Sequence, residues 1–159
     1  MTVPAGGFQA VLFDLDDTLF PQSSWLDGAW VAVAAAAVRL CAGPGRADAG
    51  AVEAALRRVA GRGTAQGGII DKALAELGLD VPVAPLVDVF RSHRPYLLEP
   101  YPGVTAGLAR LADRIPIGLV TDGEPGIQRG KVAALGLGPL FRTVVFSDEL
   151  GRNRRKPDP

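Results

Sequence analysis

The sequence predicts an α/β protein in which a parallel sheet of about three strands carries an inserted block of helices. Three short apolar runs support the sheet: Phe8 to Phe13, Ile115 to Val120 and Thr143 to Phe146. Helical segments separate these runs, and strands that alternate with helices form parallel sheets through right-handed crossovers. Polar residues follow each run, at the end of the strands where open α/β sheets bind ligands.

The helical block between the first two strands is far too long for a simple crossover. Its first helix is expected over Trp25 to Cys41, which is rich in alanine and contains no proline. Asp48 suits the N-cap of a second helix that runs to about Ala60. A third helix is expected over Ile69 to Leu77, and Pro85 suits the first turn of a fourth that runs to about Tyr96.

We therefore assign residues 21–99 to a helical cap, and residues 1–20 and 100–159 to the core that holds the sheet. Within the core, a helix is expected over Val104 to Asp113. Another helix should begin at Glu124-Pro125, after the second strand, and end near Gly136.

Composition excludes several classes of protein. Of the 159 residues, 48% are hydrophobic, which is enough to bury a core, and 17 acidic residues balance 17 basic ones. This balance gives no electrostatic case for binding nucleic acid or an anionic membrane. The single cysteine, Cys41, fits a reducing compartment, and the apolar run Ala29 to Val38 has about half of the roughly 20 residues that a bilayer span requires. We expect a cytoplasmic protein.

The most informative motif is the acidic segment that follows the first strand. If strand geometry continues, Asp14 and Asp16 share one side-chain direction, because successive side chains alternate between faces. Two carboxylates so close together repel each other unless a cation or a proton lies between them. The pair therefore indicates a metal site, a nucleophile, or both.

These residues resemble the haloacid dehalogenase-like hydrolase superfamily, whose core is a Rossmann-like parallel sheet. The resemblance is to members with a helical cap between the first and second strands. Asp14 to Thr18 is similar to the first family motif, Ile117 to Thr121 to the second, and Lys156-Pro157 to the third. The segment Tyr101 to Val104 also looks like the family's hinge.

The resemblance implies a role for each acidic residue. Asp14 would be the nucleophile that forms an aspartyl-phosphate. Asp16 would protonate the leaving alcohol and then activate water. Mg²⁺ would bind the Asp14 carboxylate and the backbone carbonyl of Asp16, since a hard cation favours oxygen ligands.

The other motifs would hold the substrate. Thr121, with Asp122, Gly123 and the N-terminus of the next helix, would bind the phosphoryl oxygens, and Lys156 would neutralise charge on them and on Asp14. In isolation, the Thr121-Asp122-Gly123 sequence is an ordinary strand-to-helix turn, and Lys156 an ordinary solvated residue.

The reaction class follows from the second aspartate. Dehalogenases of this superfamily lack an aspartate at the position of Asp16. The resemblance therefore favours a phosphatase that acts on a small phosphorylated metabolite.

The chain departs from the family pattern after Lys156. A fourth motif, an acidic pair that completes the Mg²⁺ shell, is not found before Pro159. Without further strands, Phe8 to Phe13 would be an exposed apolar edge, open to self-association. Three explanations are open. The sequence is a fragment of a longer protein, the missing strands come from another chain, or the protein is naturally short and is an inactive pseudoenzyme that acts as an interaction module. We favour the fragment.

Overall fold

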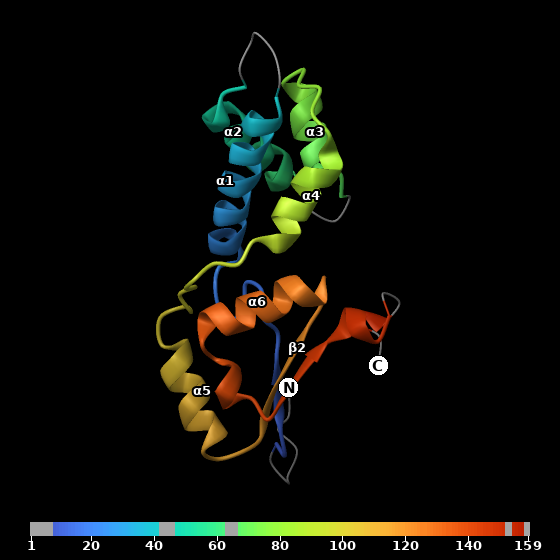
Figure 1. The fold of residues 1–159 in the computed structure, drawn as a ribbon. Coiled ribbons are helices and arrows are strands. Elements are labelled where there is room, and N and C mark those ends of the chain that lie inside the picture. Colours follow the sequence, from blue (N-terminus) through green and yellow to red (C-terminus); the bar gives the residue numbers. More distant parts are fainter. Residues whose placement is uncertain (1–7, 42–46, 63–66, 152–153, 158–159) are drawn as a thin grey trace. The chain divides into compact units, whose positions relative to one another are not determined.

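The computed structural model describes residues 8–41, 47–62, 67–151 and 154–157 (Figure 1). Tertiary contacts divide the chain into two compact units. One consists of residues 1–22 together with 94–159, and the other of residues 23–93. The first unit holds the sheet, and the second is entirely helical among its described residues.

The sheet has three parallel strands, as the sequence predicts, and their order is β1-β2-β3. The strands are β1 (Val11–Phe13), β2 (Ile117–Thr121) and β3 (Thr143–Phe146). Phe13 pairs with Leu119, and Thr121 pairs with Phe146. The register therefore brings the residues that follow each strand to one end of the sheet.

Within the described residues, the first unit also contains the named helices α5 (Val104–Ala112), α6 (Pro125–Leu135), η1 (Gly138–Leu140) and η2 (Ser147–Glu149). The bounds of α6 follow from local signals. Pro125 occupies its first turn, and Gly136 ends it with a left-handed φ of 66°, which glycine adopts without strain.

The first strand differs from its prediction. The apolar run Phe8 to Phe13 predicts a longer strand, whereas β1 spans only three residues. It lies at the edge of the described sheet, as expected for this run without further strands. Leu12 is consequently 68% exposed. An apolar sequence shows that a strand favours burial, but the strand is buried only where other elements pack against it.

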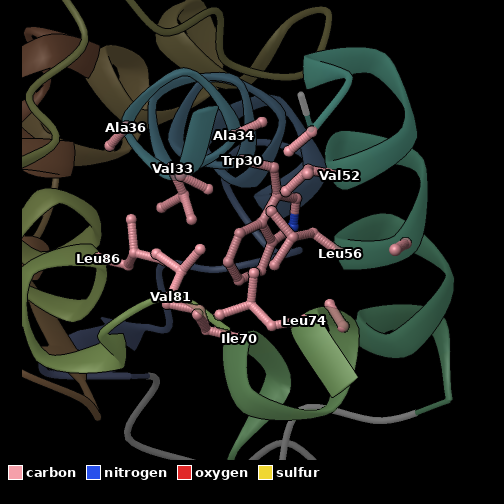
Figure 2. Close-up of a cluster of buried hydrophobic side chains, with 14 of the residues drawn as sticks. Trp30, Val33, Ala34, Ala36, Val52, Leu56, Ile70, Leu74, Val81 and Leu86 are labelled. Atoms are coloured by element: carbon pink, nitrogen blue, oxygen red, sulfur yellow. The ribbon is translucent and has the colours of Figure 1, made fainter. Parts of the chain in front are cut away.

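The second unit contains α1 (Gln22–Leu40), α2 (Ala49–Gly61), α3 (Ile69–Glu76) and α4 (Val83–Ser92). Their apolar faces enclose one hydrophobic cluster, in which Trp30 and Val33 of α1 lie with Leu56, Leu74 and Leu86 (Figure 2). The N-cap predicted at Asp48 is confirmed: its carboxylate accepts a hydrogen bond from the Gly50 N–H at 3.2 Å.

The fourth helix of this unit begins and ends earlier than predicted. It starts at Val83, so Pro85 lies in its third position, where the backbone N–H has no partner within the helix and proline is tolerated. It ends at Ser92 and not near Tyr96. Pro95 disfavours helical geometry at Arg94, and His93 already leaves it with ψ 123°.

A surface ion-pair cluster connects α2 to α3. The guanidinium groups of Arg58 and Arg62 each lie 2.8 Å from the Glu76 carboxylate. Their hydrogen bonds lower the pKa of Glu76 from its ordinary value of 4.5. The carboxylate form therefore stabilises the folded unit.

We predict that Glu76→Gln abolishes a pH-dependent part of the stability. Because the folded pKa is lowered, the contribution is fully present above about pH 4.5 and is lost as the pH falls through the folded value. The midpoint of thermal unfolding should be higher for the wild type than for the variant at neutral pH. That difference should close on acidification. Glu99→Gln is the control, and a difference of constant size at all pH values would contradict the prediction.

Candidate active site

The acidic segment after β1 is a tight loop held by its apolar residues. Leu15, Leu19 and Phe20 are buried, and the Leu19 N–H donates to the Leu15 carbonyl at 3.0 Å. The side chains of Asp14 and Asp16 remain 42% and 20% exposed. The loop thus exposes both carboxylates in part, while its three buried apolar side chains anchor it to the core.

Asp17 has a structural contact. Its carboxylate accepts a hydrogen bond from the Gln22 N–H at 2.9 Å. Gln22 is the first residue of α1, and a side-chain acceptor there satisfies an N–H that the helix leaves unpaired. This contact accounts for a helix that begins three residues before the predicted Trp25.

Lys156 lies beside Asp14, the candidate nucleophile. Its ammonium forms an ion pair with the Asp14 carboxylate and donates to the Val120 carbonyl at 3.1 Å. The ammonium therefore contacts the residues that follow β1 and the end of β2 at once. A basic residue far away in the sequence becomes the direct counter-ion of Asp14.

The segment that carries Lys156 is fixed by two carboxylates. The guanidinium of Arg155 donates to both oxygens of Asp148, at 2.6 Å each. The Lys156 N–H donates to the Asp122 carboxylate at 3.3 Å, and that carboxylate also accepts from the Ser147 hydroxyl. Asp122, the residue after β2, thereby helps to position Lys156.

Asp16 is held by two residues of α6 that sequence reasoning did not single out. The Lys131 ammonium lies 2.7 and 2.9 Å from the two carboxylate oxygens of Asp16. The Gln128 side-chain amide donates to Asp16 Oδ2 at 2.9 Å and to Thr121 Oγ1 at 2.6 Å. The first and second motifs therefore meet through one glutamine.

These partners of Asp16 are themselves buried. The Lys131 side chain is only 4% exposed, and Gln128 and Thr121 are almost completely enclosed. Burial lowers the pKa of Lys131, and the adjacent Asp16 carboxylate opposes part of that shift. A lysine enclosed in this way requires its carboxylate partner, because an unpaired buried charge is costly.

The predicted phosphoryl-binding groups all have partners within the chain. Thr121 bonds to Gln128, Asp122 to the Lys156 N–H, and the Gly123 N–H donates to Asp148 at 3.4 Å. At the start of α6, the Gly126 and Ile127 N–H groups donate to the Glu124 carboxylate at 3.1 and 2.7 Å. The helix N–H groups that we expected to face a phosphoryl group are thus bonded to their own N-cap residue.

A cavity of about 800 Å³ lies beside the exposed edge strand, with Asp14 and Lys156 among its polar groups. Its remaining lining is largely apolar: Leu12, Phe13, Val120, Val145, Ser147, Leu150 and Arg154. The nucleophile candidate therefore borders a space large enough for a small molecule.

The Asp14 carboxylate is an oxygen donor of the kind that suits a Mg²⁺ ion keeping most of its water. Within the described residues, no group of three or more His, Cys, Asp or Glu side chains converges on one point. Mg²⁺ commonly binds through one or two carboxylates, with water and substrate phosphate completing its octahedron. The Asp14 carboxylate and the Asp16 carbonyl are donors of that kind.

Spacing offered a weak signal for the two missed residues. Gln128 and Lys131 are three positions apart, so they share one face of a helix. Polar residues on a helix usually face water, however, and nothing local marks this face as buried. Only the packing of α6 against the loop of Asp16 distinguishes them.

The family model for haloacid dehalogenase-like hydrolases matches residues 8–159 of the chain. The protein therefore belongs to this hydrolase family, and the predicted relationship is confirmed. No curated protein matched the chain. Among the described residues, no helix has the length and apolarity needed to cross a membrane.

Solved structures share the fold. The chain resembles a HAD-hydrolase, YfnB from Bacillus subtilis, bound to magnesium, with 19% identity and a TM-score of 0.62 over 91% of this chain and 65% of that one. A protein described as a β-phosphoglucomutase from Thermotoga maritima gives 20% identity and a TM-score of 0.62 over 94% and 63%. At these identities the likeness concerns the fold alone.

A dehalogenase is also similar. The L-2-haloacid dehalogenase from Xanthobacter autotrophicus shares 26% identity with a TM-score of 0.52, over 89% of this chain and 58% of that one. This chain therefore spans less than two thirds of the length of each of the three structures.

We predict that Thr121→Val lowers the free energy of unfolding by about 1 to 3 kcal/mol, because a buried amide donor of Gln128 loses its acceptor. Thr143→Val is the matched control on an exposed position of β3 and should change it by less than about 0.5 kcal/mol. Denaturant unfolding measures both. Equal effects of the two changes would show that the Thr121–Gln128 bond does not stabilise the fold.

Proposed function

We propose that this protein is a Mg²⁺-dependent phosphatase that hydrolyses a phosphate monoester of a small metabolite through an aspartyl-phosphate on Asp14. The observation that carries the proposal is the pairing of each loop carboxylate with its own lysine, Asp14 with Lys156 and Asp16 with Lys131. Asp14 is open to the cavity, whereas Asp16 is held firmly beside it. A nucleophile next to a fixed proton carrier is what phosphoryl transfer to a carboxylate requires.

The first step forms the acyl phosphate. An oxygen of Asp14 attacks phosphorus, the bond from phosphorus to the ester oxygen breaks, and the Asp16 carboxyl gives its proton to the leaving alkoxide. The Lys156 ammonium offsets negative charge on Asp14 and on the incoming phosphoryl group. A bound Mg²⁺, held by the Asp14 carboxylate and the Asp16 carbonyl, would supply further positive charge.

The second step releases phosphate. Water attacks the phosphorus of the acyl phosphate, its proton passes to Asp16, and the bond to Asp14 breaks to restore the carboxylate. The same aspartate thus serves as acid and then as base. The single cysteine and the absence of charge imbalance support a cytoplasmic site of action on a soluble metabolite.

We predict that Asp14→Asn reduces hydrolysis of 4-nitrophenyl phosphate, assayed with Mg²⁺, by at least about a thousandfold, because the amide cannot act as the nucleophile. Asp17→Asn is the matched control: it makes the same change three residues away on a structural carboxylate and should retain activity. Intact mass should show a phosphorylated wild-type chain. Retained hydrolysis in Asp14→Asn would remove this residue from the nucleophile role. Release of halide from a 2-haloacid by the wild type would instead favour dehalogenation.

A second candidate function is a catalytically inactive interaction module that self-associates through its sheet edge. The exposure of Leu12 on β1 favours it, since an unpaired apolar strand can pair with another chain. If so, Leu12→Lys should convert an associated wild type into a monomer, as measured by light scattering after size exclusion. Leu40→Lys is the control, because Leu40 is an exposed leucine of α1. A monomeric wild type would contradict this candidate.

A further inference from the structure

We propose that Gln128 and Lys131 are positioning residues that fix the Asp16 carboxylate as the base for hydrolysis of the aspartyl-phosphate. This inference rests on the proposed function and assigns a task to two buried residues of α6. It starts from the hydrogen-bond pattern around Asp16.

The donors around Asp16 leave its two oxygens unequal. Oδ2 accepts from both the Lys131 ammonium and the Gln128 amide, at 2.9 Å each, whereas Oδ1 has one described donor, Lys131 at 2.7 Å. Each carboxylate oxygen carries about two lone-pair sites. Oδ2 is therefore saturated, and Oδ1 retains the lone pair that can take a proton from water.

The orientation of Gln128 is fixed by the same contacts. A carboxylate only accepts hydrogen bonds, so the amide nitrogen and not the amide oxygen must face Asp16. The same nitrogen also donates to Thr121 Oγ1 at 2.6 Å, which uses both of its hydrogens. Gln128 thus ties the base to the end of β2 and prevents the carboxylate from rotating about its own axis.

Lys131 supplies the second constraint. Its ammonium bridges both oxygens of Asp16 from inside the protein, where its side chain is 4% exposed. A buried bridge of this kind holds the plane of the carboxylate more tightly than a solvated ion pair does. Together Gln128 and Lys131 fix the direction in which Oδ1 of Asp16 points.

The task assigned to Asp16 here is the second chemical step. Water attacks phosphorus, its proton passes to Asp16 Oδ1, the bond between phosphorus and the Asp14 oxygen breaks, and inorganic phosphate leaves. All described donors on Asp16 hold its carboxylate in one orientation, with Oδ1 as the oxygen left to take the proton. Loosening that carboxylate should therefore slow dephosphorylation above all.

The test uses 4-nitrophenyl phosphate with Mg²⁺, because 4-nitrophenolate leaves readily without a proton from Asp16. Its kcat/KM reports formation of the aspartyl-phosphate, while kcat includes its hydrolysis. In Gln128→Met and Lys131→Met, we expect kcat to fall about tenfold or more and kcat/KM to stay within about threefold. A burst of nitrophenolate should accompany the change, and intact mass should show a larger fraction of phosphorylated chain than in the wild type.

Lys72→Met is the matched control, since it removes an exposed lysine of α3 and should change neither constant. Gln128→Met carries the test if the Lys131 variant fails to fold, as judged by thermal unfolding. Parallel loss of kcat and kcat/KM without a phosphorylated chain would overturn the positioning role alone. A wild-type chain that neither hydrolyses the ester nor becomes phosphorylated would overturn the proposed function and this inference with it.

Discussion

Two carboxylates placed two residues apart at the end of one strand need compensating cations, and the fold supplies one lysine to each. Lys156 pairs with Asp14, and Lys131 pairs with Asp16. The two lysines come from different segments, one after β3 and one within α6. Because parallel strands end at the same side of the sheet, these segments can converge on a single loop.

The two ion pairs differ in exposure, and the difference matches their proposed tasks. Asp14 and Lys156 are each about two fifths exposed, as a nucleophile that must meet substrate requires. Lys131 is buried, where removing an ammonium from water costs several kcal/mol unless good partners repay it. The fold accepts that cost at Asp16, whose proposed role depends on orientation more than on access.

The chain belongs to a hydrolase family, and the second aspartate directs the reaction that we propose for it. Solved relatives include a protein described as a phosphoglucomutase and a haloacid dehalogenase on the same fold. Fold alone therefore leaves the chemistry open, as it often does for widely used folds. The held carboxylate of Asp16 is the feature that favours phosphoryl transfer, because a proton carrier serves an alcohol leaving group and has no comparable use for halide.

The sequence alone predicted the three strands, the acidic loop, the N-cap of Asp48 and the residues that begin and end α6, since these depend on local periodicity and on caps. It also contained a signal at Pro95 that should have ended α4 earlier. Tertiary structure decided that β1 is only three residues long and that Gln128 and Lys131 face inward. Burial of a strand or of a polar helical face depends on what packs against it, and residues distant in the sequence supply that partner.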